Sequence, residues 1–301
     1  MEQPLRTDLP VIAGSRRRRR SIAPYLLSLP GAAWLLIFFL VPMAVTAFIS
    51  LEGGDLFTGF TFSWNFSNYS QALSSYGPIF IRSLEYGLAA TAATLVISYP
   101  MAYWIAFRGG RYKSVFLFLL LLPFFVSFVI RTISWQFILS DQGMVLGPLK
   151  ELHLLPQDYH VLATSFAVIA GLTYNFLPFM ALPIYVALER IDPRLLSAAH
   201  DLYANNVQTF LRVVVPLSIP GIFAGFLLTF VPATSDFVNA SILGGVSSTM
   251  IGNVIQTEFL TNNDYPMASA LSIILMVVLL IGVLLYARVL GTSDVTGVAE
   301  L

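Results

Sequence analysis

The chain has 301 residues, of which 57% are hydrophobic and only 11% are charged, with a formal net charge of zero at pH 7. Such a composition excludes a soluble globular domain and indicates an integral membrane protein. There is no cysteine, which excludes disulfide bonds, thiolate metal sites and a thiol nucleophile.

Residues 1–24 form a polar N-terminal segment with five consecutive arginines, 16–20. Alone, this run is typical of a nucleic-acid or anionic-lipid patch. The apolar run that follows, 25–49, is long enough to cross a bilayer and too long for the core of a signal peptide. The arginines therefore predict a cytoplasmic N-terminus, and no nucleic-acid partner is expected.

Five further apolar runs are long enough to cross the membrane. They cover about 79–107, 115–139, 161–188, 213–233 and 267–290. Backbone groups in lipid must be bonded within their segment, and the runs lack the alternation of a β-barrel, so each run is predicted to be a helix. The sequence thus predicts an all-α membrane protein with six transmembrane helices between residues 25 and 290 and a cytoplasmic tail, 291–301.

The distribution of basic residues supports this topology. With both ends inside, only Arg82, Arg131 and Lys150 of the sixteen lysines and arginines fall away from the cytoplasmic side. The outer connections are then 52–79, 140–160 and 234–266. The first is rich in Gly, Ser, Asn and aromatic residues, which predicts a folded loop at the headgroup level.

A polar stretch, 189–223, separates the fourth and fifth apolar runs and is predicted to be cytoplasmic. Asp192-Pro193 is a helix start signal. The apolar or small residues Leu195, Ala198, Ala199 and Leu202 follow at helical spacing, with His200 and Asp201 on the opposite side. The pattern predicts a short amphipathic helix at about 193–206, which Pro216 and Pro220 are expected to set apart from the next span.

This stretch resembles the EAA loop of the permease subunits of binding-protein-dependent ABC importers. The matching residues are Ala198, Ala199, Leu202, Ala204, Thr209-Phe210, Val213, Pro216-Leu217 and Pro220-Gly221-Ile222. In two departures, Ser197 stands where Glu is usual and Tyr203 where Gly is usual. If the glycine site needs a left-handed backbone, Tyr203 would cost roughly 1–2 kcal/mol there. The alternative to this resemblance is an ordinary surface connector between two spans.

Other stretches are similar to the spermidine/putrescine branch of these permeases. They are 34–42, 122–124, 131–132, 177–179, 229–237, 243–245, 250–256 and 259–270. Departures occur at Phe125 and Tyr265, where Trp is common, and at Asn239-Ala240, where a Pro-containing pair is usual. They put the exact substrate in doubt, so another small organic solute stays open.

The resemblance implies a type I ABC importer (MetI-like) permease fold in the bacterial inner membrane. It implies a second permease of the same fold, two cytoplasmic ATPase subunits that hold ATP and Mg²⁺, and an extracytoplasmic substrate-binding protein. The permease itself would have no catalytic residue, metal or cofactor. The short helix would couple to the ATPase through Leu195, Ala198, Ala199, Asp201, Leu202, Tyr203 and Ala204.

Ionisable residues near the spans are costly and are therefore candidates for the substrate path. The candidates are Asp236, Glu85, Glu258, Asp264 and Arg131. Arg131 is expected either to reach the outer headgroups or to pair with an acid such as Glu85 or Asp236. The outer half carries an excess of acidic residues, which favours a cationic substrate, although sorting of basic residues to the inside alone also produces such an excess.

Three other classes of membrane protein are alternatives to an importer. The sequence shows no internal repeat typical of a secondary transporter, no filter or charged ring of a channel, and no clustered His, Asp or Cys within the spans as in a membrane enzyme. Gly221 and Gly225 form a GxxxG pattern, which predicts close helix packing within the chain or against a second permease.

Overall fold

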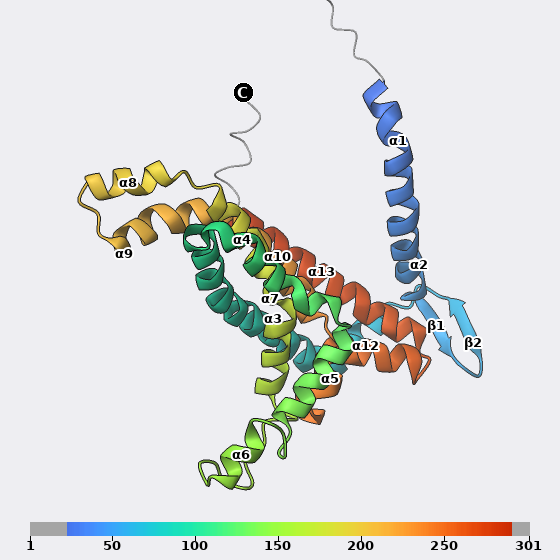
Figure 1. Cartoon of the computed structure of the whole chain (residues 1–301). Coiled ribbons are helices and arrows are strands. Elements are labelled where there is room, and N and C mark those ends of the chain that lie inside the picture. The colour runs from blue at the N-terminus through green and yellow to red at the C-terminus, as the bar shows by residue number, and fades with distance from the viewer. Residues whose placement is uncertain (1–22, 291–301) are drawn as a thin grey trace, which may run out of the picture. The chain divides into compact units, whose positions relative to one another are not determined.

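A computed structural model describes residues 23–290, so the expectations for the arginine run and for the tail 291–301 lie outside the described residues. The chain divides after Val45 into two units. The described part of the first unit is helical: α1 (Ala23–Leu35) continues through a π-helical turn (Leu36–Leu40) into α2 (Val41–Ile49). Residues Ser28–Ile49 are long and apolar enough to cross a membrane, as predicted (Figure 1).

After the end of α2, which already belongs to the second unit, the chain forms a β-hairpin and a very long helix. Strands β1 (Glu52–Asp55) and β2 (Gly59–Phe62) pair antiparallel, and α3 (Ser67–Arg108) follows. The expectation of a loop up to residue 79 is wrong for 67–79, because this part of α3 has its own packing partners. Ala72 and Phe80 pack with Ile251 of α12 (Ile251–Leu260) and Leu271 of α13 (Tyr265–Leu290).

The third predicted span is broken rather than continuous. A 3₁₀ turn (Gly110–Tyr112), α4 (Lys113–Leu121) and a second 3₁₀ turn (Leu122–Phe125) lead to Val126 and Ser127, whose backbone is extended, and α5 (Phe128–Leu139) leaves at 91°. The break packs beside the middle of α7 (Ser165–Glu189), where Phe124 contacts Phe179 and Phe128 contacts Phe176.

The bent pair nevertheless runs the length of α7. At one end, Lys113 Nζ lies 2.9 Å from Glu189 Oε1, and at the other Leu139 shares an apolar cluster with Ala167. A short helix, α6 (Leu146–Glu151), lies in the connection between α5 and α7. Among the described residues, five unbroken helices are long and apolar enough to span, and the bent pair supplies the sixth predicted crossing.

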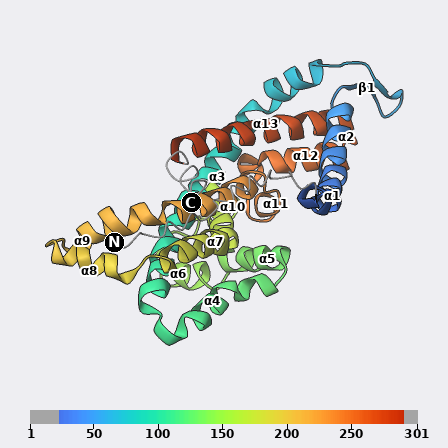
Figure 2. The ribbon, with the colours of Figure 1, turned by 90° about the horizontal axis from the view of Figure 1, so that it is seen from above.

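Helix α7 forms the centre of the second unit. Thr164 caps its start, where Thr164 Oγ1 accepts a hydrogen bond from Ala167 N. Val168 and Leu172 pack against α3 and α10 (Val215–Thr234), and Ile184 and Leu188 pack against the other end of α3. Seen from above, α13 lies on one side of α7 and α10, and α4 and α5 lie on the other (Figure 2).

Two small helices and a π-helical turn precede α10. These are α8 (Pro193–Asp201), α9 (Asn206–Thr209) and the turn Phe210–Val214, and from Asn206 to Thr234 the helix is continuous. The expected break at Pro216 and Pro220 is therefore wrong. Pro216 lies at the start of α10, directly after the π-helical turn, where Val215 N–H bonds to the Phe210 carbonyl, so its missing N–H is tolerated.

The glycine pair of α10 packs within the chain. A Cβ on Gly221 would lie 2.5 Å from Ala187 Cβ and 2.6 Å from the Pro183 carbonyl oxygen, and one on Gly225 would meet Met180. The two glycines therefore let α10 and α7 approach closely, which is the first of the two predicted packing modes. The chain then forms α11 (Val238–Leu243), a 3₁₀ turn (Val246–Ser248), α12 and α13.

Candidate functional site

Helix α8 and the turn after it form an element that projects beyond the ends of α7 and α10 (Figure 1). Asp192 caps α8, because its Oδ1 accepts a hydrogen bond from Arg194 N at 2.9 Å, and Pro193 occupies the first turn. The helix ends at Asp201, earlier than the expected 206. The reason is a second start signal: Asn205 and Gln208 exchange the two hydrogen bonds of a capping box and begin α9.

The end of α8 explains the tyrosine that stands where the related permeases have glycine. Tyr203 N–H bonds to the His200 carbonyl and Ala204 N–H to the Ala199 carbonyl, the two bonds of a Schellman cap. Its central residue must be left-handed, and Tyr203 has φ of 62°. Tyr203 therefore adopts the left-handed backbone conformation that glycine favours, and its Cβ makes this conformation strained.

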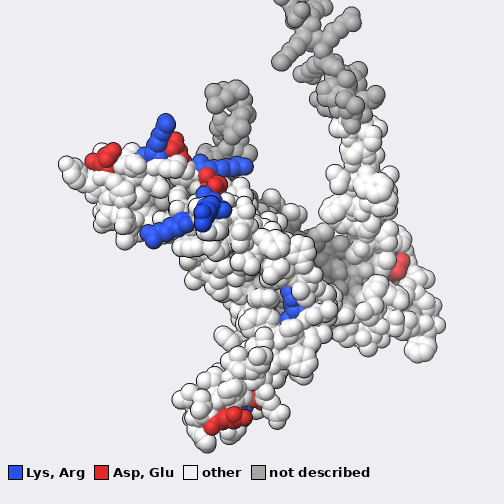
Figure 3. Space-filling model, viewed as in Figure 1, with Lys and Arg blue, Asp and Glu red and all other residues white. Residues whose placement is uncertain are grey.

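The tip of this element exposes apolar side chains. Leu202 is 81% exposed and Tyr203 97% exposed, and Leu195 is also exposed. Of the other candidate coupling residues, Ala198 and Asp201 are exposed and Ala199 and Ala204 are partly buried. Leu196, which was not a candidate, packs back against the cluster around Ile184 and Leu188. The exposed arginines Arg108, Arg111, Arg190, Arg194 and Arg212 gather at this end of the unit (Figure 3).

Arg131 adopts neither of the two expected arrangements. Its side chain lies among aromatic rings of the bent span, with the guanidinium carbon 4.8 Å from the Phe124 ring centre and 5.6 Å from that of Phe128. The residue is only 7% exposed, and Nε and Nη1 have no hydrogen-bond partner. No carboxylate among residues 23–290 forms an ion pair with Arg131. The two acids expected as partners, Glu85 and Asp236, are therefore not paired with it.

Asp236 is buried and caps a helix. Its Oδ1 accepts hydrogen bonds from the backbone N of Asn239 at 2.7 Å and from Asn239 Nδ2 at 3.2 Å. Asn239 Oδ1 in turn accepts from Asn175 Nδ2 and Thr132 Oγ1, so a buried polar network joins α5, α7 and α11. Burial raises the pKa of the Asp236 carboxyl to about 6.

Sequence reasoning missed Asn175 and Thr132 in this network. The signal was available, since an asparagine inside an apolar span needs a buried partner. The sequence does not show that Asn175 pairs with Asn239, because the two residues are 64 positions apart in the chain.

Two further acidic candidates have structural partners. Glu258 is buried, and its carboxylate accepts hydrogen bonds from Tyr76 Oη at 2.6 Å and Asn262 Nδ2 at 2.9 Å. Asp264 caps α13, where its Oδ1 accepts from Met267 N at 3.0 Å. Both carboxylates therefore have structural roles at the ends of helices.

Glu85 has a different environment from the other acids. It is exposed on α3, between the exposed apolar residues Ile81 and Leu88, and it makes no hydrogen bond or ion pair with residues 23–290. A bare carboxylate on a spanning helix is costly against lipid. This face of α3 therefore meets water, another subunit or a cationic ligand.

Residues 98–290 match the family described as the binding-protein-dependent transport system inner membrane component. The chain belongs to this family. It is therefore a multi-pass inner-membrane transport component rather than an enzyme, and the resemblance drawn from the EAA loop is confirmed.

Curated relatives of this permease cover most of its length. It is 37% identical over 257 residues to the spermidine/putrescine transport system permease protein PotB of Haemophilus influenzae, covering 85% of this chain and 90% of that one. For PotB of Escherichia coli K12 the identity is 36% over 259 residues, covering 85% and 93%. The fold matches the crystal structure of a bacterial ABC transporter that imports the acidic polysaccharide alginate, with a TM-score of 0.70, 21% identity and coverage of 90% and 96%.

Replacing Tyr203 with glycine is expected to stabilise the permease by about 1 kcal/mol, because glycine adopts a left-handed backbone without the Cβ penalty. Tyr203→Phe keeps the Cβ and should melt with the wild type. Thermal unfolding of the three purified chains measures the difference. A Tyr203→Gly chain that melts below wild type would show that the tyrosine ring has a stabilising contact.

Proposed function

We propose that this permease forms half of the membrane path of an ATP-driven importer of polyamines such as spermidine and putrescine. The identity to two PotB proteins over 85% of the chain supports the substrate class. The structural observation that carries the importer role is the exposed tip of α8, where apolar side chains face away from the rest of the chain.

The partners follow from the family and from the shape of α8. A second permease would complete the path, an extracytoplasmic binding protein would deliver the substrate, and two ATPase subunits would bind ATP and Mg²⁺. The segment 193–206 would dock on an ATPase subunit through Leu195, Ala198, Ala199, Asp201, Leu202, Tyr203 and Ala204. ATP binding would then shift the two permeases between outward-open and inward-open states.

The proposed topology places both termini and α8 in the cytoplasm. Six crossings return the chain to the side where it began, and the exposed arginines beside α8 fit the positive-inside rule. The segments 1–24 and 291–301 would then be cytoplasmic, on either side of the membrane domain 25–290.

Among the path candidates, Glu85 fits a cationic substrate best. Its carboxylate is exposed and unpaired, whereas Asp236, Glu258 and Asp264 are engaged in helix caps and buried hydrogen bonds. Arg131 beside Phe124 and Phe128 would tune the path through its positive charge rather than bind an ammonium group. An ammonium–carboxylate contact at Glu85 would bind a polyamine and repel an anion.

Uptake of labelled spermidine into vesicles that hold the complete complex tests this proposal. Glu85→Gln should lower uptake about tenfold, since it removes one charge-assisted hydrogen bond, while basal ATP hydrolysis stays at the wild-type rate. Glu151→Gln, an exposed acid on α6, serves as the matched control. Unchanged spermidine uptake by Glu85→Gln would remove Glu85 from the path, and uptake of another organic solute instead would overturn the polyamine assignment.

A further inference from the structure

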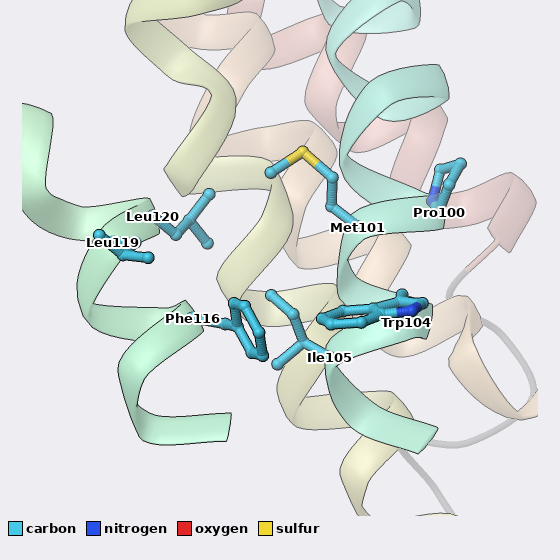
Figure 4. A pocket seen from close by; sticks show the side chains of 7 residues that line it. All are labelled: Pro100, Met101, Trp104, Ile105, Phe116, Leu119 and Leu120. Atoms are coloured by element: carbon cyan, nitrogen blue, oxygen red, sulfur yellow. The ribbon is translucent and has the colours of Figure 1, made fainter. Parts of the chain in front are cut away.

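A groove between the C-terminal part of α3 and α4 has no role in the proposed function. Its volume is about 490 Å³, and the seven residues that line it are all apolar (Figure 4). Trp104 of α3 and Phe116 of α4 meet edge to face at one end, with ring centres 4.7 Å apart. Met101 and Leu119 line it further along, and both are exposed. The groove is therefore an open apolar slot on the membrane-spanning surface.

Two arginines lie at the end of the groove where α3 stops. Arg108 is one helical turn beyond Trp104 and so lies on the same face of α3. Arg111 follows in the turn to α4, where its guanidinium packs over the Tyr112 ring at 4.7 Å. Both are exposed, and neither pairs with a carboxylate of residues 23–290, whereas the neighbouring Lys113 is neutralised by Glu189. The end of the groove thus has a net positive charge.

We propose that this groove binds an anionic phospholipid. One acyl chain would lie along Met101, Trp104 and Leu119, and the phosphate would bind Arg108 and Arg111. Basic pockets between spanning helices at the cytoplasmic face are suited to anionic headgroups, and tryptophan prefers the level of the membrane interface. The unpaired positive charge at the end of the groove is complementary to an anionic headgroup, and this charge favours a lipid over an apolar helix.

The four tryptophans of the chain allow a direct test, because Trp104 lines the groove. In the full chain with Trp34, Trp64 and Trp135 replaced by phenylalanine, brominated lipids quench the fluorescence of Trp104 alone. In mixed vesicles, brominated phosphatidylglycerol should quench at a lower mole fraction than brominated phosphatidylcholine. Arg108→Gln with Arg111→Gln should reduce this preference about tenfold, to near unity.

Two matched variants separate the acyl-chain site from general attraction to a charged surface. Arg212→Gln removes an exposed arginine outside the groove and should leave the preference unchanged. Leu119→Phe narrows the groove and should weaken quenching by both lipids without changing their ratio. Equal quenching by the two lipids, or a preference that survives the double arginine substitution, would overturn the proposal.

The assembled complex supplies the last arm of the test. Phosphatidylglycerol should co-purify with the wild-type complex in native mass spectrometry and be depleted in the double arginine variant. Loss of Trp104 quenching when the second permease is bound would instead show that protein covers the groove, and would also overturn the proposal. Neither result depends on which solute is imported or on the coupling role of α8.

Discussion

Replacing Gly221 with valine is expected to prevent stable folding of the permease. The glycine is buried where α10 crosses α7, and a Cβ there would lie 2.5 Å from Ala187 Cβ and 2.6 Å from a backbone oxygen. Backbone cannot yield as a flexible side chain can, so the two helices must separate. We expect a loss of about 3 kcal/mol or more.

The measurement is thermal unfolding and size-exclusion elution of the full chain in detergent. Gly282→Val is the matched control, because no atom lies within 4 Å of a Cβ built on Gly282 in α13. The control should elute and melt with the wild type, while Gly221→Val should aggregate or melt far lower. A Gly221→Val chain that melts with its control would mean that α7 and α10 are not in close contact.

Replacing Leu202 with aspartate is expected to abolish coupling to the ATPase without affecting the fold. The side chain is 81% exposed at the end of α8, so residues 23–290 bury little of it. If the tip docks in an apolar groove of the partner, an aspartate must be buried there without a counter-charge. Such a change at the centre of an interface costs about 2–3 kcal/mol, or roughly a hundredfold in affinity.

Co-purification of the ATPase and substrate-stimulated ATP hydrolysis measure this effect. Val246→Asp is the control, since Val246 is even more exposed, at 97%, but lies between α11 and α12, away from α8. It should retain the ATPase and its stimulation. Wild-type stimulation in the Leu202→Asp complex would rule out the tip of α8 as the coupling contact.

The number and positions of the spans could be predicted because apolar length is a direct requirement of the bilayer. Whether a span is unbroken could not be predicted, since proline alone does not decide it. Pro178 lies inside α7, which is one of the unbroken spans, whereas Pro123 lies just before the break between α4 and α5. Pro216 similarly ends no helix, because a π-helical turn precedes it.

The candidate site was predictable in part for a related reason. The start of α8 is encoded locally by Asp192-Pro193. Its end is a Schellman cap in which Tyr203 occupies the position that is usually glycine. The roles of the acids depend on distant partners: Glu258 is bonded to Tyr76, 182 positions away, and a count of charges contains no such information. Of the four acidic path candidates, Glu85 alone is exposed, as the charge count assumed for all of them.

The break between α4 and α5 also indicates which side of the permease is turned away from lipid. Phe125, Val126 and Ser127 are exposed, and Ser127 provides no side-chain cap for the first N–H groups of α5. Hydrocarbon cannot solvate such groups, and irregular backbone persists at this depth only beside protein or a water-filled cavity. This part of the surface therefore faces a second subunit or a water-filled cavity rather than acyl chains, beside the middle of α7.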